Sequence, residues 1–354
     1  MHAVAALALL LLGAACAEAF TPGATRAPSA RRRPPTELHA VTPSDVTVMM
    51  NGLPGKMGLD VAAACMRRGM TLADVALTGP GMPGTVAVDD QAGGAAQHVA
   101  LFAGPGADGA EAAVAGALAE ARAANKVLVA IDFTHPTAVN VNGDLYKKLE
   151  VPFVMGTTGG DREALARTVE EGRHAAVIAP NMSKQIVAMQ ACLERMAVDF
   201  PGSFGGYTLT TTESHQSAKA DTSGTAKAVV GSLTKLVDAA ATPATVDAAI
   251  GAINLVRDEP RQLTGDDNVL TPVTPSALAG HAYHTYRLGS DDGTVEFQLR
   301  HNVDGRRTYA EGTADAVMFL ARRCAAAAAS PECRDDPARK RLFNMIDVLE
   351  AGEM

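Results

Sequence analysis

The sequence predicts an α/β protein with a doubly wound parallel sheet, followed by a second α+β domain with a mixed sheet. Three observations support this fold class. The chain has 354 residues, more than one hydrophobic core usually serves, since single cores stop growing at about 250–300 residues. Apolar runs alternate with helical stretches between residues 46 and 155. Aromatic residues make up only 4% of the chain, which suits close packing of helices on a sheet.

The first domain is predicted over residues 45–180 from this alternation of strands and helices. Strands are expected at 46–50, 73–77, 127–133 and 151–155, with short edge strands between 79 and 98 and an undecided segment at 99–102. Helices are expected at 59–68, at 111–124 and, after the strand at 127–133, up to about residue 149. The run at 127–133 is continuously apolar, which is typical of a strand buried on both faces.

The second domain is predicted over residues 181–313, where the pattern changes. A helix at 184–198, a strand at 207–212, a helix at 225–239 and a strand-rich stretch at 282–309 indicate a mixed α+β arrangement. Two further helices, at about 314–324 and 338–350, are expected in a C-terminal segment, 314–354, that returns to pack on the first domain.

Net charge and cysteine usage limit the kinds of partner. The formal charge is −8, and because phosphate backbones require a basic face, a general nucleic-acid surface is not expected. The five cysteines are scattered, with no C-x-x-C pair. We therefore expect reduced thiols and no metal site.

The N-terminal segment reads as a presequence, predicted to span residues 1–44. Residues 4–15 are apolar but too short to cross a bilayer, and Ala17-Glu18-Ala19 offers a cleavage site before Phe20. A basic, acid-poor stretch follows to about residue 40. This order resembles the bipartite presequence of algae whose plastid lies inside extra membranes. It predicts a mature protein in the plastid stroma, without a membrane segment; an ordinary secretory signal is the alternative, because His2 is the only potentially positive side chain before the apolar run.

Three glycines lie between the first predicted strand and the first predicted helix, at Gly52, Gly55 and Gly58. Glycine lets a backbone turn sharply and approach a pyrophosphate, whose charge meets free N–H groups at a helix start. The spacing alone also fits a plain strand-to-helix turn, but its position favours a Rossmann-type dinucleotide site. Loops at the carboxyl ends of parallel strands form the ligand crevice, so 132–136 and 156–160 are expected to join it.

The phosphate preference can be read in part from the second predicted strand. Folds specific for NAD usually carry an acid at the end of that strand, which binds the ribose hydroxyls. Here the strand ends in Ala76-Leu77-Thr78-Gly79-Pro80, without an acid, and Lys56 adds a positive charge to the glycine loop. The sequence therefore favours NADPH, with NADH possible.

The segment from Thr212 to Lys227 carries the candidate chemistry. Lys219 can offer protons and attract a carboxylate, and His215 titrates near neutral pH. Ser223-Gly224-Thr225 opens a helix, so its hydroxyls and N–H groups can hold a carboxylate. The alternative is a polar loop in which Ser223 merely caps the helix. The close grouping of these residues favours the active site.

At this point the chain resembles the dihydrodipicolinate reductase family. The two motifs of that family, G-x-x-G-[RK]-M-G and E-x-H-x-x-x-K-x-D followed by S-G-T-A, match Gly52–Gly58 and Glu213–Ala226. The segments 132–136, 156–159, 179–183 and 342–349 resemble the family's other loops and closing helix. Gln216, in place of a second histidine, and the segment 309–312 are similar to the plant-type branch.

The resemblance implies NADPH-dependent reduction of 4-hydroxy-tetrahydrodipicolinate to tetrahydrodipicolinate in lysine (diaminopimelate) biosynthesis. His215 would give a proton to carbon and Lys219 would act as an acid, while Gln216, Ser223, Gly224 and Thr225 would bind this small dicarboxylate. A homodimer or homotetramer is the expectation. The cofactor contacts that it implies are Gly52, Leu53, Pro54, Gly55, Lys56, Met57, Gly58, Thr134, Gly156, Thr157, Thr158, Ala179, Pro180, Asn181 and Met182.

Some residues and functions stay outside this assignment. His135 is expected to be an ordinary loop residue, the Met182 side chain is more typical of core filler, and His281 and His284 are left out of the site, facing either the cleft or the solvent.

Two other functions compete: another two-domain dehydrogenase, such as a homoserine or aspartate dehydrogenase, and a non-catalytic dinucleotide-binding homologue. The His215 to Thr225 segment argues against the dehydrogenases, and the intact pair His215 and Lys219 argues against the non-catalytic protein.

Overall fold

The structure, a computed structural model, describes residues 41–82, 84–266, 269–329 and 339–352. The predicted signal core, cleavage site and basic stretch lie outside the described residues. Within those ranges, no helix combines the length and the apolar character that crossing a bilayer requires.

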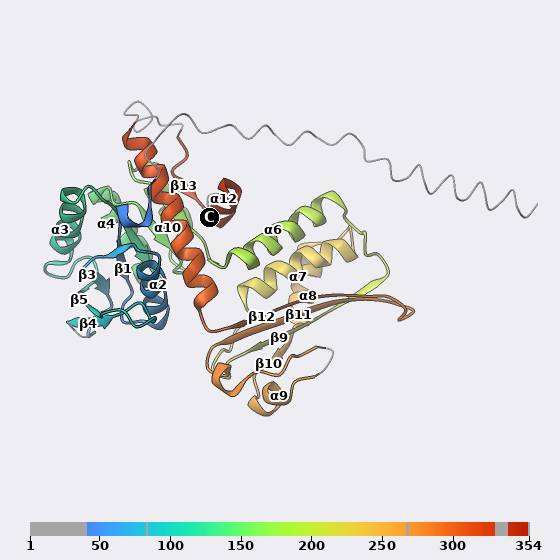
Figure 1. Ribbon diagram of the computed structural model, residues 1–354. Coiled ribbons are helices and arrows are strands. Elements are labelled where there is room, and N and C mark those ends of the chain that lie inside the picture. Colours follow the sequence, from blue (N-terminus) through green and yellow to red (C-terminus); the bar gives the residue numbers. More distant parts are fainter. Residues whose placement is uncertain (1–40, 83, 267–268, 330–338, 353–354) are drawn as a thin grey trace, which may run out of the picture. The chain divides into compact units, whose positions relative to one another are not determined.

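The first sheet has six strands, all joined in parallel, in the order β13-β8-β7-β6-β1-β2. Figure 1 shows β1 beside the helix that follows it. The parallel order confirms the predicted Rossmann-type sheet. Its strands are β1 (Val46–Asn51), β2 (Thr71–Leu72), β6 (Val127–Asp132), β7 (Phe153–Met155), β8 (Ala176–Ile178) and β13 (Leu342–Phe343). Its helices are α2 (Lys56–Arg67), α3 (Ala110–Ala123), α4 (Val139–Leu149) and α5 (Arg162–Glu170).

Both faces of this sheet are buried, because successive side chains of a strand point to opposite faces. Val48 and Met50 of β1 join one hydrophobic cluster with residues of α2 and of α10 (Arg307–Ala328). Met49 joins a second cluster with residues of α3 and α4. The continuous apolar run at the middle of the sheet is therefore explained by two separate layers of helices.

The strand predicted at 73–77 is found at 75–78 and lies outside the main sheet, which is a correction. Residues Thr71 and Leu72 pair with β1 as β2, whereas β3 (Val75–Thr78) pairs with β5 (Gln97–Ala103) in a separate sheet of order β3-β5-β4. The chain leaves the main sheet at Asp74, because the Leu77 N–H bonds to the Asn51 side chain rather than to a strand backbone. The undecided segment 99–102 is thus part of β5, and β4 (Thr85–Val88) is the short edge strand expected between 79 and 98.

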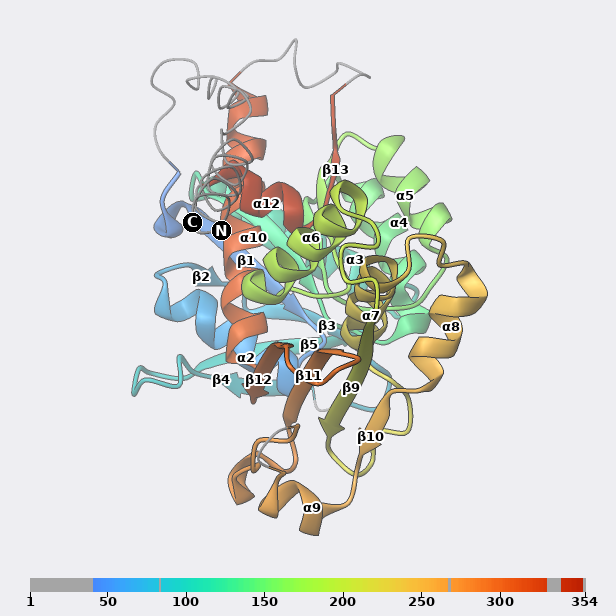
Figure 2. The same ribbon diagram turned by 90° about the vertical axis from the view of Figure 1, so that its right-hand side faces the viewer.

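The second sheet has four strands in the order β10-β9-β11-β12 and is mixed, as predicted. Its strands are β9 (Tyr207–His215), β10 (Asn254–Val256), β11 (His281–Ser290) and β12 (Glu296–Asp304). Strand β9 runs parallel to β10 and antiparallel to β11. Helix α7 (Gly224–Val237) contacts β9 and also packs on α6 (Lys184–Asp199), as Figure 2 shows. Short helices α8 (Pro243–Gly251) and α9 (Glu259–Thr264) complete this part.

The C-terminal segment differs from the prediction at both ends. Helix α10 begins at Arg307, so residues 307–309 are helical rather than part of a strand-rich stretch. The helix expected at 338–350 is confirmed only in its second half: Leu342 and Phe343 pair with β8, and only then does α12 (Met345–Ala351) begin. The Asn344 side chain accepts hydrogen bonds from the Ile346 and Asp347 N–H groups, so it starts a new helix there.

Ion pairs join α2, which follows the glycine loop, to α10. Arg68 binds Glu311 at 2.8 Å and Asp315 at 2.5 Å, and Arg67 binds Glu311 at 3.1 Å. Lys184, at the start of α6, binds the same Asp315 at 2.6 Å. Because several partly buried charges share partners, this network fixes α2 better than an isolated surface pair would.

Candidate active site

The glycine loop is closed so tightly that side chains do not fit at two of its positions. Gly52 has φ +101°, and a Cβ there would lie 2.3 Å from the Phe133 carbonyl oxygen. A Cβ at Gly55 would lie 2.7 Å from the Gly52 carbonyl oxygen. Gly55 is the residue before α2, which begins at Lys56 instead of Leu59 as expected. The first-turn N–H groups of α2, which have no partner within a helix, are therefore next to the loop.

A cavity of about 830 Å³ opens at this loop. Its position at the strand ends, beside a helix start, and its glycine-rich wall fit a dinucleotide phosphate. None of the described lining residues carries a carboxylate. The lining residues are Gly52, Leu53, Pro54, Gly55, Leu77, Thr78, Gly79, Pro80, Met82, Gly104, Pro105, Phe133, Thr134, His135, Thr137, Ala138, Val141 and Asn142.

The fully buried carboxylate of Asp132 ties the three predicted loops together. Its Oδ1 accepts from the Thr134 hydroxyl at 2.7 Å and the Thr157 hydroxyl at 3.0 Å. Its Oδ2 accepts from the Asn142 amide and the Tyr146 hydroxyl, each at 2.8 Å. We call these residues, with Asn51, the Asp132 cluster. Asn51 donates to the Tyr146 oxygen at 2.7 Å, so the cluster reaches the end of β1.

Tyr146 is the only weak acid among the donors of the Asp132 cluster. Burial, together with the neighbouring Asp132 charge, raises the pKa of Tyr146 well above its usual value. The hydroxyl therefore stays a donor, and every donor of this cluster is neutral. The three loops are predicted to share one edge of the sheet, and this one carboxylate links them there. Sequence reasoning did not identify Asp132 as the link.

The predicted cofactor residues do not all line the cavity. Gly52 to Gly55 and Thr134 do, and so does His135, which was expected to be an ordinary loop residue. Thr158 and Pro180 are exposed, whereas Thr157, Ala179 and Met182 are buried. Met182 joins the hydrophobic core, as its side chain was expected to do. Lys56 and Met57 lie in the first turn of α2, Gly58 is buried there, and a Cβ at Gly156 would meet the Phe133 ring at 2.2 Å.

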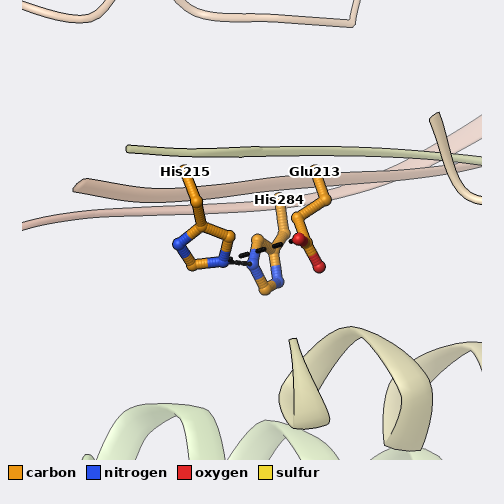
Figure 3. A group of neighbouring side chains, drawn as sticks. All are labelled: Glu213, His215 and His284. Carbon is orange, nitrogen blue, oxygen red and sulfur yellow. Dashed lines mark hydrogen bonds and ion pairs between the residues drawn. The ribbon is translucent and has the colours of Figure 1, made fainter. Parts of the chain in front are cut away.

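Neither His215 nor Lys219 lines that cavity; they belong to a separate group at the end of β9. Glu213 and His215 point from the same face of β9, two residues apart. Register pairs His284 of β11 directly with Glu213, and His301 of β12 directly with His284. We call Glu213, His215, Arg257, His284, Tyr286 and His301 the Glu213 cluster; Figure 3 shows Glu213, His215 and His284 on one side of the strands.

Glu213 is fully buried and paired with a guanidinium. Arg257, just past β10, donates to Glu213 Oε1 at 2.5 Å, and the Ser223 N–H donates to Oε2 at 2.8 Å. Arg257 also donates to the Lys219 carbonyl oxygen at 2.7 Å. The same guanidinium therefore holds the buried carboxylate and the loop that carries the predicted catalytic lysine.

His215 is buried, and its ring is held at both nitrogens. Nδ1 lies 3.0 Å from the His281 carbonyl oxygen and Nε2 lies 3.1 Å from Nε2 of His284. Burial, with Arg257 nearby, lowers the pKa of His215 to about 4. Burial and the neighbouring His301 likewise lower the pKa of His284 well below its usual value. Both rings are neutral at pH 7, so a proton donated by His215 has to be acquired during turnover.

Lys219 and the helix start carry the remaining predicted residues. The Lys219 ammonium binds the exposed Asp221 carboxylate at 2.6 Å. Gln216 is half-buried and its carbonyl oxygen accepts from the Lys219 N–H. Ser223 precedes α7, but its N–H is already bonded to Glu213, so the first-turn N–H groups that remain for a ligand begin at Gly224 and Thr225. The Thr225 hydroxyl accepts from the Asn181 amide at 3.1 Å, which joins a predicted cofactor residue to a predicted substrate residue.

His281 and His284 were left out of the predicted site, and neither faces the solvent. Both are buried; the His281 ring bonds to Ser214 at 2.9 Å, while His284 contacts His215. The spacing of three residues puts them on opposite faces of β11, which sequence could have indicated. Which face meets His215 depends on the register with β9, and no local pattern reveals that register.

Glu213, His215 and His284 could together offer three ligand atoms to a metal ion, all within 4.8 Å of one another. The carboxylate oxygen of that group, Oε1, already accepts from Arg257 at 2.5 Å. A guanidinium at the ligating oxygen opposes a divalent cation. The residues of the Glu213 cluster are therefore better suited to bind protons than a metal ion.

Known proteins resemble this chain along nearly its whole length. Residues 46–182 match the family model "Dihydrodipicolinate reductase, N-terminus" and residues 185–349 match "Dihydrodipicolinate reductase, C-terminus". The chloroplastic 4-hydroxy-tetrahydrodipicolinate reductase 2 of Arabidopsis thaliana is 40% identical over 323 residues, 89% of this chain and 81% of the relative. A probable chloroplastic reductase of this name from Oryza sativa subsp. japonica is 40% identical over 308 residues, 87% of this chain and 79% of the relative.

A solved structure supports the fold independently. Dipicolinate-bound dihydrodipicolinate reductase from Paenisporosarcina sp. TG-14 matches with a TM-score of 0.52 at 19% identity, covering 84% of this chain and 96% of that chain. At this identity the match speaks for the fold alone. The two family models cover both halves of the chain, which sets aside a homoserine or aspartate dehydrogenase. The chain therefore belongs to the dihydrodipicolinate reductase family.

Proposed function

We propose that this chain reduces 4-hydroxy-tetrahydrodipicolinate to tetrahydrodipicolinate with NADPH, a step of lysine biosynthesis through diaminopimelate. The observation that carries the proposal is the Glu213–Ala226 segment: it retains the family's His215, which ends β9, and Lys219, whose loop is held by the same Arg257 that pairs with the buried Glu213. A decayed, non-catalytic homologue would have no reason to keep a buried charge pair behind an intact His and Lys.

The domain roles follow from the same proposal. Residues 45–180 would bind the dinucleotide, 181–313 would bind substrate and form the oligomer contacts, and 314–354 would pack back on the dinucleotide domain. Support for the last role comes from the ion pair of Arg68 with Asp315 and from the pairing of Leu342 and Phe343 with β8. A homodimer or homotetramer is proposed, with a plastid stroma location after loss of residues 1–44, in line with the chloroplastic names of the relatives.

The cofactor would bind at the glycine loop, its phosphates against the start of α2. Bound there, it supplies the hydride. The proposed contacts are those predicted above, from Gly52 to Gly58, at Thr134, from Gly156 to Thr158 and from Ala179 to Met182. Preference for NADPH is supported by the carboxylate-free cavity lining, because an acid there would bind ribose hydroxyls and repel a 2′-phosphate. The exposed Lys56 would attract that phosphate.

The chain's own residues would hold the dicarboxylate and move the protons. Gly224 and Thr225 would donate N–H groups to one carboxylate, with Gln216 and Ser223 beside it. Lys219 would exchange its exposed partner Asp221 for the substrate and act as an acid. Negative charge from the substrate would raise the pKa of His215 from about 4, so this ring takes up a proton when substrate is bound and passes it to carbon.

An assay of cofactor oxidation, with substrate generated in place by the preceding synthase, tests the proposal. We expect NADPH oxidation that depends on the synthase, with NADH used less efficiently. His215→Ala and Lys219→Ala should each lower kcat by about 10²–10⁴-fold while NADPH still binds. If no cofactor oxidation depends on the synthase, the proposed function is wrong. If the catalytic efficiencies with NADPH and NADH are equal, only the proposed NADPH preference is wrong.

A further inference from the structure

The neutral histidine rings of the Glu213 cluster belong to a chain of hydrogen bonds whose direction is fixed at one end. His215 Nδ1 lies 3.0 Å from the His281 carbonyl oxygen. A carbonyl oxygen only accepts, so Nδ1 carries the proton. Because a neutral imidazole has one proton, Nε2 of His215 is then the bare nitrogen and must accept.

The partner of that bare nitrogen is His284. Nε2 of His284 lies 3.1 Å away and must therefore donate, which leaves Nδ1 of His284 bare. Nδ1 in turn lies 3.0 Å from the Tyr286 hydroxyl, which donates to it. Burial, with the Glu213 charge nearby, raises the pKa of Tyr286, so its hydroxyl keeps the proton that this bond needs. One arrangement of protons satisfies every contact from Tyr286 to His281.

We propose that His284 is a positioning residue for His215: it fixes the ring of the catalytic histidine and presents its Nε2 as a proton acceptor, with Tyr286 selecting the tautomer of His284 that does so. This inference rests on the proposed function of His215. The backbone register makes the contact possible, because His284 stands opposite Glu213 and hence beside His215.

The arrangement has a consequence for proton uptake. If His215 gains a proton at Nε2, two N–H groups would face each other across the contact with His284 unless His284 also changes. One added proton resolves this. It binds to Nδ1 of His284, while the proton on Nε2 of His284 passes to Nε2 of His215. Tyr286 rotates its hydroxyl so that its oxygen accepts from Nδ1 of His284. Glu213, Arg257, Lys219, His281 and His301 surround the two rings and set the pH at which this occurs.

Three variants separate positioning from mere packing. His284→Leu removes the donor and should lower kcat by about 10–100-fold with an unchanged KM for NADPH. His284→Gln returns an N–H near the same place, so it should recover most of that loss. His174→Phe is the matched control: His174 is a buried histidine that stacks on Phe153, away from the Glu213 cluster, and its ring nitrogens have no hydrogen-bond partner among the described residues, so kcat should not change.

The tautomer itself can be measured without turnover. In protein labelled with ¹⁵N-histidine, NMR should find His215 protonated at Nδ1 and bare at Nε2 near pH 7. In Tyr286→Phe, His284 should no longer be held in a single tautomer. A protonated Nε2 of His215, or wild-type kcat in His284→Leu when His215→Ala is inactive, would overturn the inference. If wild-type protein fails to turn over the substrate, the proposed function falls while the NMR result still decides the proton arrangement.

Discussion

Two fully buried carboxylates organise the two parts of this molecule, and they do so with different partners. Asp132, at the end of β6, accepts from the hydroxyls of Thr134, Thr157 and Tyr146 and from the Asn142 amide. Glu213, near the end of β9, is paired with the Arg257 guanidinium and lies beside His215. One carboxylate gathers neutral donors and shapes loops; the other gathers ionisable groups and sets protonation.

The difference shows how a buried charge can be made tolerable in two ways. Neutral donors are small dipoles that can turn, so the Asp132 cluster spreads one charge over several adjustable bonds. An ion pair concentrates the compensation in one partner, and removing either member leaves the other charge uncompensated. The two clusters should therefore respond differently to the same isosteric change from carboxylate to amide.

The largest expected effect is that of Glu213→Gln. The amide removes the charge that balances Arg257, and its NH₂ would face either the guanidinium or the Ser223 N–H. We expect the free energy of unfolding to fall by about 3–5 kcal/mol, measured by denaturant titration at pH 7. Asp221→Asn is the matched control, since that carboxylate is 79% exposed and should matter by less than about 1 kcal/mol. Equal losses in the two variants would erase the distinction between the clusters.

The same exchange at Asp132 should cost less. In Asp132→Asn the new NH₂ would face Asn142, whose Oδ1 is buried with no partner among the described residues and can turn to accept it. The hydroxyls of Thr134 and Tyr146 can also rotate. We expect a loss of about 1–2 kcal/mol in unfolding free energy. Because the loops of the glycine-lined cavity are loosened, KM for NADPH should rise in steady-state assays while KM for the dicarboxylate stays unchanged.

A loss at Asp132 as large as that at Glu213 would show that adjustable donors give no advantage. A change confined to the substrate KM would instead contradict the assignment of the Asp132 cluster to the cofactor side.

Sequence reasoning found the residues that belong to local motifs and missed those brought in by register. Gly52, Gly55, His215 and Lys219 lie in short patterns whose spacing has a physical meaning on a strand or a helix start. Arg257 is 44 residues from Glu213 in the chain and reaches it only because β10 pairs in parallel with β9. No local pattern carries that information.

The errors in the fold have the same origin. The tail at 338–350 has helical periodicity, yet Leu342 and Phe343 find open edge positions beside β8 and become a strand. The stretch at 73–77 is expected in the main sheet because no local pattern indicates that Asn51 accepts the Leu77 N–H. In both cases a partner distant in sequence overrides local propensity.

Acid should unfold the protein through its buried histidines. Burial lowers the pKa of His301 to about 4, against an ordinary value of 6.5. Between these values the unfolded chain binds more protons, so this contribution to stability is complete above pH 6.5 and is lost as pH falls toward 4. His301→Phe should remove about 1 kcal/mol per pH unit from the slope of unfolding free energy in that window, measured by denaturant titrations from pH 4 to 7.

His135→Ala controls for the loss of any histidine, because His135 is exposed. A slope as steep in His301→Phe as in the wild type would mean that His301 takes up its proton in the folded state.

The smallest expected effect separates binding from folding at the start of α7. A Cβ at Gly224 would meet no atom within 4 Å and the residue needs no left-handed backbone, so Gly224→Ala should leave unfolding free energy unchanged or raise it by up to about 1 kcal/mol. If a substrate carboxylate sits against this helix start, the added methyl should raise KM for the dicarboxylate severalfold without changing KM for NADPH. Gly52→Ala provides the contrast, because its Cβ would lie 2.3 Å from the Phe133 carbonyl oxygen, so it should lose both cofactor binding and stability. A Gly224→Ala protein with wild-type kinetics would place the substrate carboxylate elsewhere and leave Lys219 as its main anchor.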